Sequence, residues 1–368
     1  MHILYVESHY EGAHRDWIDS YRARSQHTFT LLTMPGGDWR WRLHGGALHL
    51  AREFLAQRPR LVPVDLLLIN GMVNAPLFLA ATHPHLAAVP LAVYFQENQL
   101  TYPPEPGDRL LWQDGFVNVM SAYVADLVGF NGAYLQQDFL TSLAAFVTDR
   151  QDYPADIISR ITARSQVLPR GIDLRERFGP PPRRQPPQAP LTLLWSHRWA
   201  YEKGVEDFAV VLRQLHQEGW PFEVILAGDP WRYAGLKAEL TVELGDRVVM
   251  QGLLQGADYV EALRRADVIV APAQNEPLGV SVLEALYMGC FPVLPARGSF
   301  PWLLPPEQHD LLYDGSQAGL LACLRALLSK PESAYRPALQ AVGAAHDWGA
   351  VIQHYDTSLA VLGKYSFE

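Results

Sequence analysis

The chain has 368 residues, of which 49% are apolar and 19% are charged, an ordinary globular composition with enough length for two domains. Its formal net charge of −9 argues against tight binding to nucleic acid over the whole surface, because such binding comes largely from neutralised phosphates. No apolar run reaches the roughly 20 residues of a membrane span, no signal peptide opens the chain, and no Cys/His cluster has zinc-site spacing, so we expect a soluble cytoplasmic protein with neither membrane contact nor a metal.

Apolar runs that suit buried parallel strands alternate with amphipathic stretches through the first 175 residues. This is the pattern of a doubly wound α/β domain. Helices such as Ala47–Leu55 and Tyr134–Phe146 are expected between the strands, and we predict a Rossmann-like domain over residues 1–175. The predicted strands are Ile3–Val6, Phe29–Leu32, Val64–Ile69, Leu91–Phe95 and Leu127–Phe130.

A proline-rich segment, residues 176–190, separates this domain from a second run of the same alternation. Its core, Phe178–Pro187, can form neither a helix nor a central strand and suits a semi-rigid linker. We predict a second Rossmann-like domain over residues 191–346. Its expected strands are Leu191–Trp195, Glu223–Ala227, Val248–Gln251, Val268–Ala271 and Pro292–Leu294, and its helices include Val205–Glu218, Asp258–Arg265 and Val280–Met288.

The last segment, residues 347–368, contains a predicted helix over Asp347–Leu362, which we expect to cross back to the first domain. Ligands of open α/β sheets bind outside the carboxyl ends of the strands. The functional site is therefore expected in a cleft between two facing domains.

The loop after the predicted strand Val268–Ala271 carries the strongest chemical signal. Glu276 precedes a helix whose first turn suits Pro277. The backbone amides near Leu278 and Gly279 would then face outward and bind a diphosphate. Glu276 itself can accept hydrogen bonds from sugar hydroxyls, and the alternative is that it only complements the helix dipole.

Glu284 lies eight residues after Glu276, inside an otherwise apolar helix, where a carboxylate is costly unless it is hydrogen-bonded. A ribose diol offers two hydroxyl donors to one carboxylate. We therefore interpret Glu284 as a nucleotide-binding residue. A structural arginine would satisfy the same carboxylate, and this alternative stays open.

Two cations follow the strand Leu191–Trp195. Arg198 and Lys203 straddle the predicted strand-to-helix turn, where they can converge on one diphosphate and offset the charge of a leaving nucleotide. The alternative is a pair of solvated surface cations. A weaker signal is Gly228, at the end of the next strand, where it would lie beside a base or ribose pocket.

The first domain carries polar and aromatic side chains at its predicted strand ends. Gly12 permits close approach of a ligand and His14 follows it. The cluster Trp39, Arg40, Trp41 and Arg42 interleaves aromatic rings with cations. It could stack a base and bind phosphate, or form a half-buried surface stripe.

Polar side chains also follow the predicted strand Leu91–Phe95. Gln96, Glu97 and Asn98 stand at its end, where the cleft is expected. A polar loop without function is the alternative.

With these residues in hand, the chain resembles the family 4 glycosyltransferases. Their hallmark, Glu-x7-Glu, is matched by Glu276 and Glu284 and is followed by an Ala-x-x-x-Gly segment at Ala285–Gly289. Val167–Asp173 looks like the strand that precedes the family's interdomain crossover. The resemblance implies the GT-B fold and transfer of a hexose from a nucleotide-sugar with retention of configuration.

More narrowly, the chain resembles the tRNA-queuosine mannosyltransferases. The resemblance implies GDP-mannose as donor, the cyclopentenediol of queuosine in a tRNA anticodon as acceptor, and an α linkage. One position departs from it, because Gln96 stands where a histidine is expected, which leaves the hexose open. The matching segments are Glu7–His14, Trp39–Arg42, Phe95–Pro103, Ala125–Asn131 and Ser196–Trp199.

The mechanism expected from this resemblance gives the diphosphate to Arg198 and Lys203, the ribose to Glu284 and the hexose to Glu276. No activated protein nucleophile is found in the sequence. Two alternatives remain: the same chemistry on a small-molecule, lipid or polysaccharide acceptor, and a nucleotide-sugar epimerase or non-catalytic binding protein.

Overall fold

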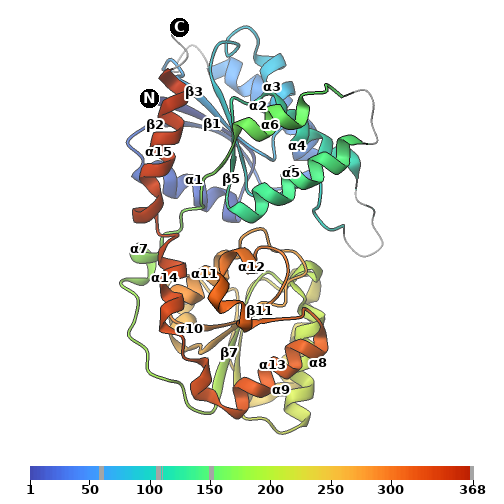
Figure 1. The fold of residues 1–368 in the computed structure, drawn as a ribbon, viewed down its shortest axis with the longest axis vertical. Coiled ribbons are helices and arrows are strands. Elements are labelled where there is room, and N and C mark those ends of the chain that lie inside the picture. Colours follow the sequence, from blue (N-terminus) through green and yellow to red (C-terminus); the bar gives the residue numbers. More distant parts are fainter. Residues whose placement is uncertain (58–61, 105–108, 110, 149–152, 365–368) are drawn as a thin grey trace. The chain divides into compact units, whose positions relative to one another are not determined.

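Two six-stranded parallel sheets organise the chain in a computed structural model that describes residues 1–57, 62–104, 109, 111–148 and 153–364 (Figure 1). Each sheet belongs to one compact unit. Unit 1 comprises residues 1–172 and 348–368, and unit 2 comprises residues 173–347. The predicted pair of doubly wound α/β folds is confirmed.

The sheet of unit 1 has the order β2-β1-β3-β4-β5-β6, and all its strand pairs are parallel. Its strands are β1 (His2–Tyr10), β2 (Thr28–Pro35), β3 (Leu66–Asn70), β4 (Leu91–Phe95), β5 (Leu127–Phe130) and β6 (Ser165–Val167). Its helices are α1 (Gly12–Arg24), α2 (Trp39–Gln57), α3 (Ala75–Thr82), α4 (Trp112–Val124), α5 (Ala133–Thr148), α6 (Ile157–Arg164) and α15 (Trp348–Lys364).

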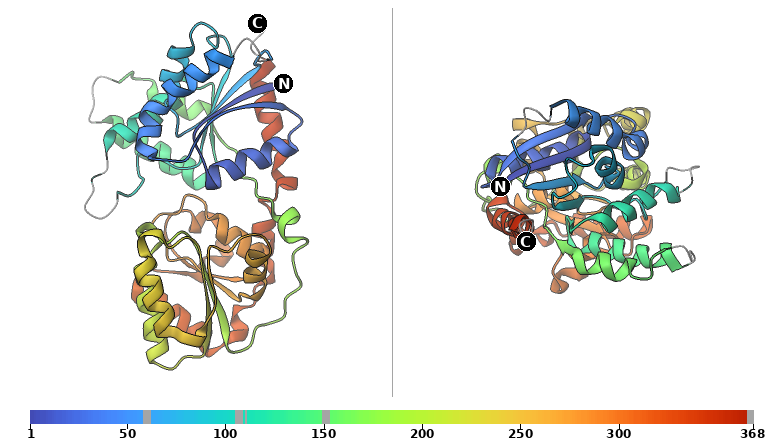
Figure 2. Two further views of the ribbon diagram at one scale, coloured as in Figure 1. Left: turned by 180° about the vertical axis from the view of Figure 1, so that it is seen from behind. Right: turned by 90° about the horizontal axis from the view of Figure 1, so that it is seen from above.

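Helices cover both faces of this sheet, which explains why its strands read as continuous apolar runs. Leu4 and Val6 of β1 pack with helices α2 to α6 on one face. Ile3 and Tyr5 point to the opposite face, where α1 and α15 lie. Both views in Figure 2 place α15, at the red end of the chain, beside the blue strands of unit 1.

Aromatic packing and one buried carboxylate attach α15 to unit 1. The rings of Tyr21 and Trp348 stack with centroids 5.6 Å apart, and the hydroxyls of Tyr94 and Tyr355 lie 2.7 Å apart. The Asp356 carboxylate accepts hydrogen bonds from the Tyr21 hydroxyl at 2.9 Å and from the backbone amide of Gln26 at 2.9 Å. Helix α15 therefore completes the core of unit 1.

The sheet of unit 2 has the order β12-β11-β10-β7-β8-β9, again with parallel pairs. Its strands are β7 (Leu191–Ser196), β8 (Phe222–Ala227), β9 (Val248–Gly252), β10 (Val268–Val270), β11 (Phe291–Pro295) and β12 (Leu312–Tyr313). Its helices are α7 (Leu174–Phe178), α8 (Val205–Gln217), α9 (Ala234–Leu244), α10 (Gly256–Arg265), α11 (Val280–Tyr287), α12 (Phe300–Leu303), α13 (Gln317–Ser329) and α14 (Gln340–Ala344).

The proline-rich segment contains no helix or strand over residues 180–190, but it is attached to unit 2. The Arg184 guanidinium donates to the carbonyls of Met288, Ala266 and Leu263 at 2.6–2.7 Å. These carbonyls lie at or just beyond the C-terminal ends of α11 and α10, where a cation complements the helix dipole. The segment is thus fixed along unit 2 rather than free.

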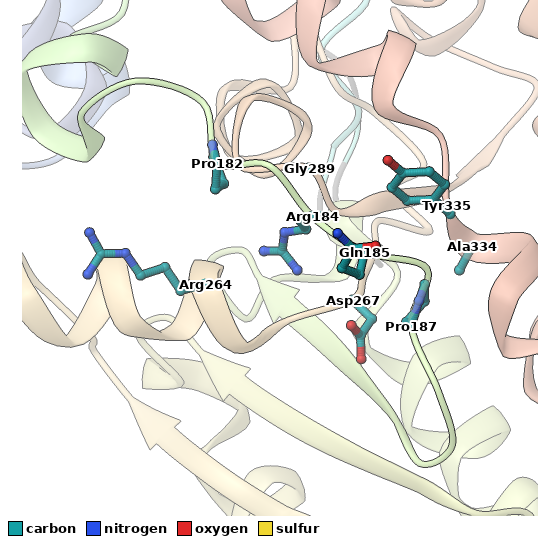
Figure 3. A pocket seen from close by; sticks show the side chains of 9 residues that line it. All are labelled: Pro182, Arg184, Gln185, Pro187, Arg264, Asp267, Gly289, Ala334 and Tyr335. Carbon is teal, nitrogen blue, oxygen red and sulfur yellow. The ribbon is translucent and has the colours of Figure 1, made fainter.

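A pocket of about 370 Å³ opens beside this segment (Figure 3). Asp267 and Gly289, two of its lining residues, stand just before β10 and β11. The pocket therefore lies at the amino edge of the sheet, opposite to the edge where α/β sheets bind their ligands. Its lining consists of Pro182, Arg184, Gln185, Pro187, Arg264, Asp267, Gly289, Ala334 and Tyr335.

The strand orders locate one switch point in each unit. A switch point is the place where the chain begins to add strands on the other side of the sheet. In unit 1, β2 follows β1 on one side, whereas β4 follows β3 on the other side. In unit 2, the same reversal separates β7 from β10. The crevice at such a point is where this class of sheet binds ligands, so the loops after β1, β3, β7 and β10 are the places to examine.

Candidate functional site

The switch point of unit 2 holds an ion pair between the loops after β7 and β10. Lys203 Nζ lies 2.9 Å from Glu276 Oε2 and 3.4 Å from the carbonyl oxygen of Asn275. Both side chains are mostly buried, at 16% and 12% exposure. The two residues selected from the sequence for phosphate and sugar therefore meet at one point.

The charge of this pair is controlled by its surroundings. Burial alone would raise the pKa of the Glu276 carboxyl, but Lys203, His197 and the Gly279 amide outweigh it and hold that pKa below its usual value. Burial also lowers the pKa of His197 to about 4, with Lys203 adding to the effect. Glu276 is thus an anion and His197 a neutral imidazole at neutral pH.

Arg198 stands in the same loop but has a different partner. Its guanidinium Nη2 lies 2.6 Å from Glu202 Oε1, while 64% of the Arg198 side chain is exposed. Glu202 is buried, and its carbonyl oxygen accepts the backbone amides of Gln274 and Asn275. Arg198 therefore lies at the surface of the loop that carries Lys203.

Close backbone approach explains the glycines of this edge. Gly228 has φ +104°, and a Cβ there would lie 2.1 Å from the His197 carbonyl oxygen. Gly204 has φ +73°, and a Cβ there would lie 2.4 Å from the Pro272 carbonyl oxygen. Only glycine fits both positions, so the loops after β7, β8 and β10 are in contact at their main chains.

Glu284 is buried in α11 and satisfied by protein groups. Arg177 Nη1 donates to its Oε1 at 2.5 Å, and the Tyr259 hydroxyl donates to its Oε2 at 2.7 Å. The Tyr259 hydroxyl also lies 3.1 Å from Ser196 Oγ. The alternative of a structural arginine, left open by the sequence, is thus present, although each carboxylate oxygen retains capacity for a further donor.

The start of α11 differs from the expectation. The helix begins at Val280, so Pro277 lies ahead of the first turn rather than inside it. Gly279 adopts φ +87°, and its amide donates to Glu276 Oε1 at 3.0 Å. Leu278 is buried. Glu276 thus accepts a hydrogen bond from one of the backbone amides that were expected to bind a diphosphate.

The switch point of unit 1 holds a second buried carboxylate. Glu7 is fully buried near the end of β1, and its Oε2 lies 3.0 Å from His14 Nδ1 in the first turn of α1. Gly12, at the first position of α1, has φ +49° and is exposed. Gly12 and His14 therefore stand where the strand order places a ligand.

Gln96 is buried after β4 with its side-chain amide only half satisfied. Its Oε1 accepts a hydrogen bond from Arg170, and its backbone carbonyl accepts from Asn131 Nδ2 at 2.9 Å. Its Nε2 is buried and has no hydrogen-bond partner within the described part of the chain. A buried donor of this kind is costly unless a ligand satisfies it.

The neighbours of Gln96 are held by the protein. Glu97 Oε1 accepts Gln99 Nε2 at 2.7 Å, and Asn98 Nδ2 donates to Asp138 Oδ2 at 2.8 Å. These contacts fix the loop after β4 around Gln96. Of the three polar residues expected at this strand end, Gln96 is the one left with an orphan donor.

Trp39, Arg40, Trp41 and Arg42 form the first turn of α2, which begins eight residues before the predicted helix start at Ala47. The Arg40 guanidinium lies 4.7 Å from the centre of the Trp39 ring and its Nε 3.2 Å from Asp114 Oδ2. Trp41 is 77% exposed, and Arg42 Nη1 contacts Met34 Sδ at 3.6 Å. The cluster is a helix start with one strongly exposed ring.

Several residues of these sites escaped the sequence reasoning. Arg177, Tyr259 and Glu202 are paired with predicted site residues, and Arg170 orients Gln96. In the sequence, Arg177 could be noticed only as an arginine after the segment Val167–Asp173. Glu202 could be noticed only as a glutamate between Arg198 and Lys203. In the described ranges, no group of three or more His, Cys, Asp or Glu side chains is arranged to hold a metal ion, and no helix is long and apolar enough to cross a membrane.

Comparisons with known proteins divide the chain at the same place as the fold. Residues 2–172 match the family described as tRNA-queuosine alpha-mannosyltransferase N-terminal, and residues 181–341 match the glycosyl transferases group 1. The tRNA-queuosine alpha-mannosyltransferase of Drosophila melanogaster is 30% identical over 332 residues, which cover 86% of this chain and 84% of the relative. The 2-deoxystreptamine glucosyltransferase of Streptomyces kanamyceticus is 26% identical over 215 residues, 55% of this chain and 52% of the relative.

Solved structures establish the fold. Sucrose-phosphate synthase from Thermosynechococcus elongatus superposes with a TM-score of 0.72 at 16% identity, covering 99% of this chain and 100% of that one. Anabaena HepE in complex with UDP superposes with a TM-score of 0.66 at 16% identity, covering 98% and 100%. The expected GT-B fold of glycosyltransferases is confirmed.

Proposed function

We propose, from the premise that this chain belongs to the tRNA-queuosine alpha-mannosyltransferase family of glycosyltransferases, that it transfers mannose from GDP-mannose to queuosine in tRNA. The acceptor atom is a hydroxyl of the queuosine cyclopentenediol, and the new linkage is α, with retention of configuration. The reaction requires no metal or cofactor. The single observation that carries the proposal is the Lys203–Glu276 pair at the switch point of unit 2.

Unit 2 binds the donor in this proposal. Lys203 and Arg198 hold the diphosphate, together with the backbone amide of Leu278, while the Gly279 amide holds Glu276. Glu276, kept anionic by Lys203, accepts hydrogen bonds from hydroxyls of the hexose.

The nucleoside of the donor occupies the neighbouring part of unit 2. Glu284 accepts the ribose diol, since Arg177 and Tyr259 each use only part of one carboxylate oxygen. Gly228 lets the nucleotide approach the main chain, and Pro277 shapes the loop ahead of α11.

The chemistry follows from these positions. The bond between the anomeric carbon and the phosphate oxygen breaks, and an oxocarbenium-like centre forms. Lys203 and Arg198 offset the negative charge that develops on the departing diphosphate. The acceptor oxygen attacks from the same face, and its proton passes to the departing phosphate oxygen, so no protein nucleophile is required.

Unit 1 binds the acceptor. The orphan amide of Gln96 donates to a hydroxyl of the bound substrate, which removes the cost of burying it without a partner. Glu97, Asn98, Gly12 and His14 line the same edge. The first turn of α2, Trp39 to Arg42, offers ring faces and guanidinium groups to an RNA loop.

The donor assignment is tested by thermal unfolding of the purified protein with a panel of nucleotide-sugars. A ligand at 100 times its Kd stabilises the folded state by about 2.7 kcal/mol. We expect GDP-mannose to raise the unfolding temperature of the wild-type chain and not that of a Lys203→Ala variant. Stabilisation by a UDP-sugar alone would contradict the donor, and stabilisation by none would contradict the site.

A second candidate keeps the donor chemistry and changes the acceptor. It is favoured by the net charge of −9 and by the match to a 2-deoxystreptamine glucosyltransferase over about half of this chain. Nucleoside analysis of tRNA from a strain lacking the gene separates the two candidates. The tRNA proposal predicts loss of mannosylated queuosine, and an unchanged nucleoside profile would favour the second candidate.

A further inference from the structure

Glu7 is a carboxylate with no exposed surface, near the carboxyl end of β1. Its Oε1 accepts the backbone amide of His9 at 2.8 Å, and its Oε2 accepts the Tyr5 hydroxyl at 3.1 Å. The third donor is His14 Nδ1, 3.0 Å from Oε2. Three donors satisfy this side chain in a place where an unpaired carboxylate would be very unfavourable.

His14 is oriented by this carboxylate and leaves its second nitrogen available. With Nδ1–H donated to Glu7, the neutral ring carries its lone pair on Nε2. No described residue forms a hydrogen bond to Nε2, and 14% of the His14 side chain is exposed. The lone pair therefore remains available to a ligand at the switch point of unit 1.

The stability of helix α1 does not explain the pairing of Glu7 with His14. His14 is the third residue of α1, and a histidine that becomes cationic there opposes the positive end of the helix dipole. A buried apolar pair at these two positions would avoid the burial of a charge. A carboxylate that fixes the tautomer and direction of an imidazole is instead a common arrangement where the other nitrogen contacts a ligand.

We propose that His14 Nε2 accepts a hydrogen bond from the second hydroxyl of the acceptor diol, next to the attacking one, and that Glu7 is the positioning residue that holds the ring in this orientation. The inference rests on the proposed function and names a role within it. The proton of the attacking hydroxyl passes to the departing phosphate oxygen, so the charge of His14 does not change during transfer. Its contribution is to aim an oxygen lone pair at the anomeric carbon.

The charges around His14 set the pH range in which it can act. Burial and Arg170 lower the pKa of His14, whereas Glu7 and Glu97 raise it, and the result lies above its usual value of 6.5. The His9 ring, with its centroid 6.1 Å from that of His14, is the other titratable neighbour. Because the neutral ring is the active form, acceptor transfer should fall as pH drops through this raised pKa.

The test compares His14→Gln and Glu7→Gln with His49→Gln, a control on the exposed side of α2. Three quantities are measured for each protein: transfer to queuosine-containing tRNA, slow hydrolysis of GDP-mannose without acceptor, and thermal stabilisation by GDP-mannose. We expect His14→Gln to lower kcat/KM for the acceptor by about 10- to 100-fold, the range of one lost hydrogen bond. Hydrolysis and stabilisation should not change.

Glu7→Gln provides the second readout, because it removes the charge that raises the pKa of His14. In the Glu7→Gln variant, the fall in the rate of acceptor transfer at acid pH should move to lower pH. The His14→Gln variant should not show that fall. Equal transfer by His14→Gln and wild type, or a parallel fall of transfer and hydrolysis, overturns the inference alone. Absence of transfer by the wild type with every donor overturns the proposed function and this inference with it.

Discussion

Ion pairs hold the acidic side chains of the proposed donor site in unit 2. Lys203 neutralises Glu276, Arg177 neutralises Glu284 and Arg198 neutralises Glu202. Removing only one partner of a buried ion pair strongly destabilises the folded protein, since the other charge then stays buried alone. Single substitutions in this site should therefore affect both stability and activity, and the two effects have to be measured separately.

Lys203→Ala should abolish measurable transfer, a loss of at least about 100-fold, because the departing diphosphate loses its buried cation. Glu276 would lose its partner, at a cost to the free energy of unfolding of about 1–3 kcal/mol. Initial-rate measurements and chemical denaturation on the same preparation check both effects. Lys330→Ala, at an exposed position, is the matched control. Wild-type transfer by the Lys203 variant would remove the diphosphate assignment.

His197 should make the stability of unit 2 depend on pH in the acid range. Burial lowers its pKa to about 4, so between about pH 4 and 6.5 the unfolded chain binds a proton that the folded chain does not. The free energy of unfolding should therefore rise with pH across this window, by up to about 3 kcal/mol. Denaturation of His197→Gln at several pH values should show a shallower rise, and His309→Gln, on the surface, should not. An identical slope in the His197 variant would refute the assignment.

The positions of candidate residues were predictable where the sequence pattern is local. Glu276, Lys203 and Arg198 could be selected because they follow predicted strands. The Arg177–Glu284 pair joins residues separated by 107 positions, and no local pattern specifies such a contact. The orphan amide of Gln96 likewise depends on Arg170, which reaches it from the end of another strand.

Among the elements, the loops at the carboxyl edge of unit 2 depend on glycine for their contacts. The loop after β8 reaches the loop after β7 at Gly228 and Asp229, where the Trp199 amide donates to the Asp229 carbonyl at 3.1 Å. This contact fixes the main chain on either side of Arg198. The geometry of the donor site is thus set by main-chain packing as well as by ion pairs.

Gly228→Ala should destabilise unit 2 by more than a change of backbone conformation alone. Its φ of +104° is unfavourable for alanine by about 1–3 kcal/mol, and the new Cβ would also meet the His197 carbonyl oxygen. Gly219→Ala is the matched control, because Gly219 has φ +78° and no atom within 4 Å of the added Cβ. Calorimetry should show a larger fall in unfolding temperature for Gly228→Ala. Equal falls would mean that the two loops do not constrain each other.

Elements with a clear apolar or amphipathic pattern were predicted well, and the shortest edge strands were not. The helix α15 begins one residue after the predicted start at Asp347. The edge strand β12 has only two residues and follows a 3-10 turn, so it carries no period to detect. Helix α2 begins at Trp39 because its first turn packs on α4 through Arg40 and Asp114, a contact absent from the local sequence. Val167–Asp173 was expected to be a strand, but β6 ends at Val167.

At the scale of the whole molecule, unit 1 is built from both ends of the chain. The apolar face of α15 places Trp348, Val351, Tyr355 and Leu359 in the core that also contains residues of β1, β3 and α1. Unit 2 is continuous in sequence and is wrapped by the segment that carries Arg184. The two units should therefore respond differently to loss of the C-terminus.

A chain that ends at Asp347 should lose the cooperative unfolding of unit 1. Burial of four large apolar side chains contributes about 6–12 kcal/mol, which is comparable with the net stability of a typical domain. Calorimetry should show the transition of unit 2 alone, accompanied by binding of a hydrophobic dye. A chain that ends at Lys364 retains α15 and should behave as the full-length protein. Two unchanged transitions in the shorter chain would contradict the role of α15.

The central claim is that a donor site in unit 2 and an acceptor site in unit 1 together mannosylate queuosine. Its most direct test is transfer of labelled mannose from GDP-mannose to purified tRNA that contains queuosine, with the same tRNA carrying unmodified guanosine as control. The account predicts label only in queuosine-containing tRNA, released as an α-mannosyl nucleoside on digestion. Label in both tRNAs, in neither, or in a β linkage would contradict it.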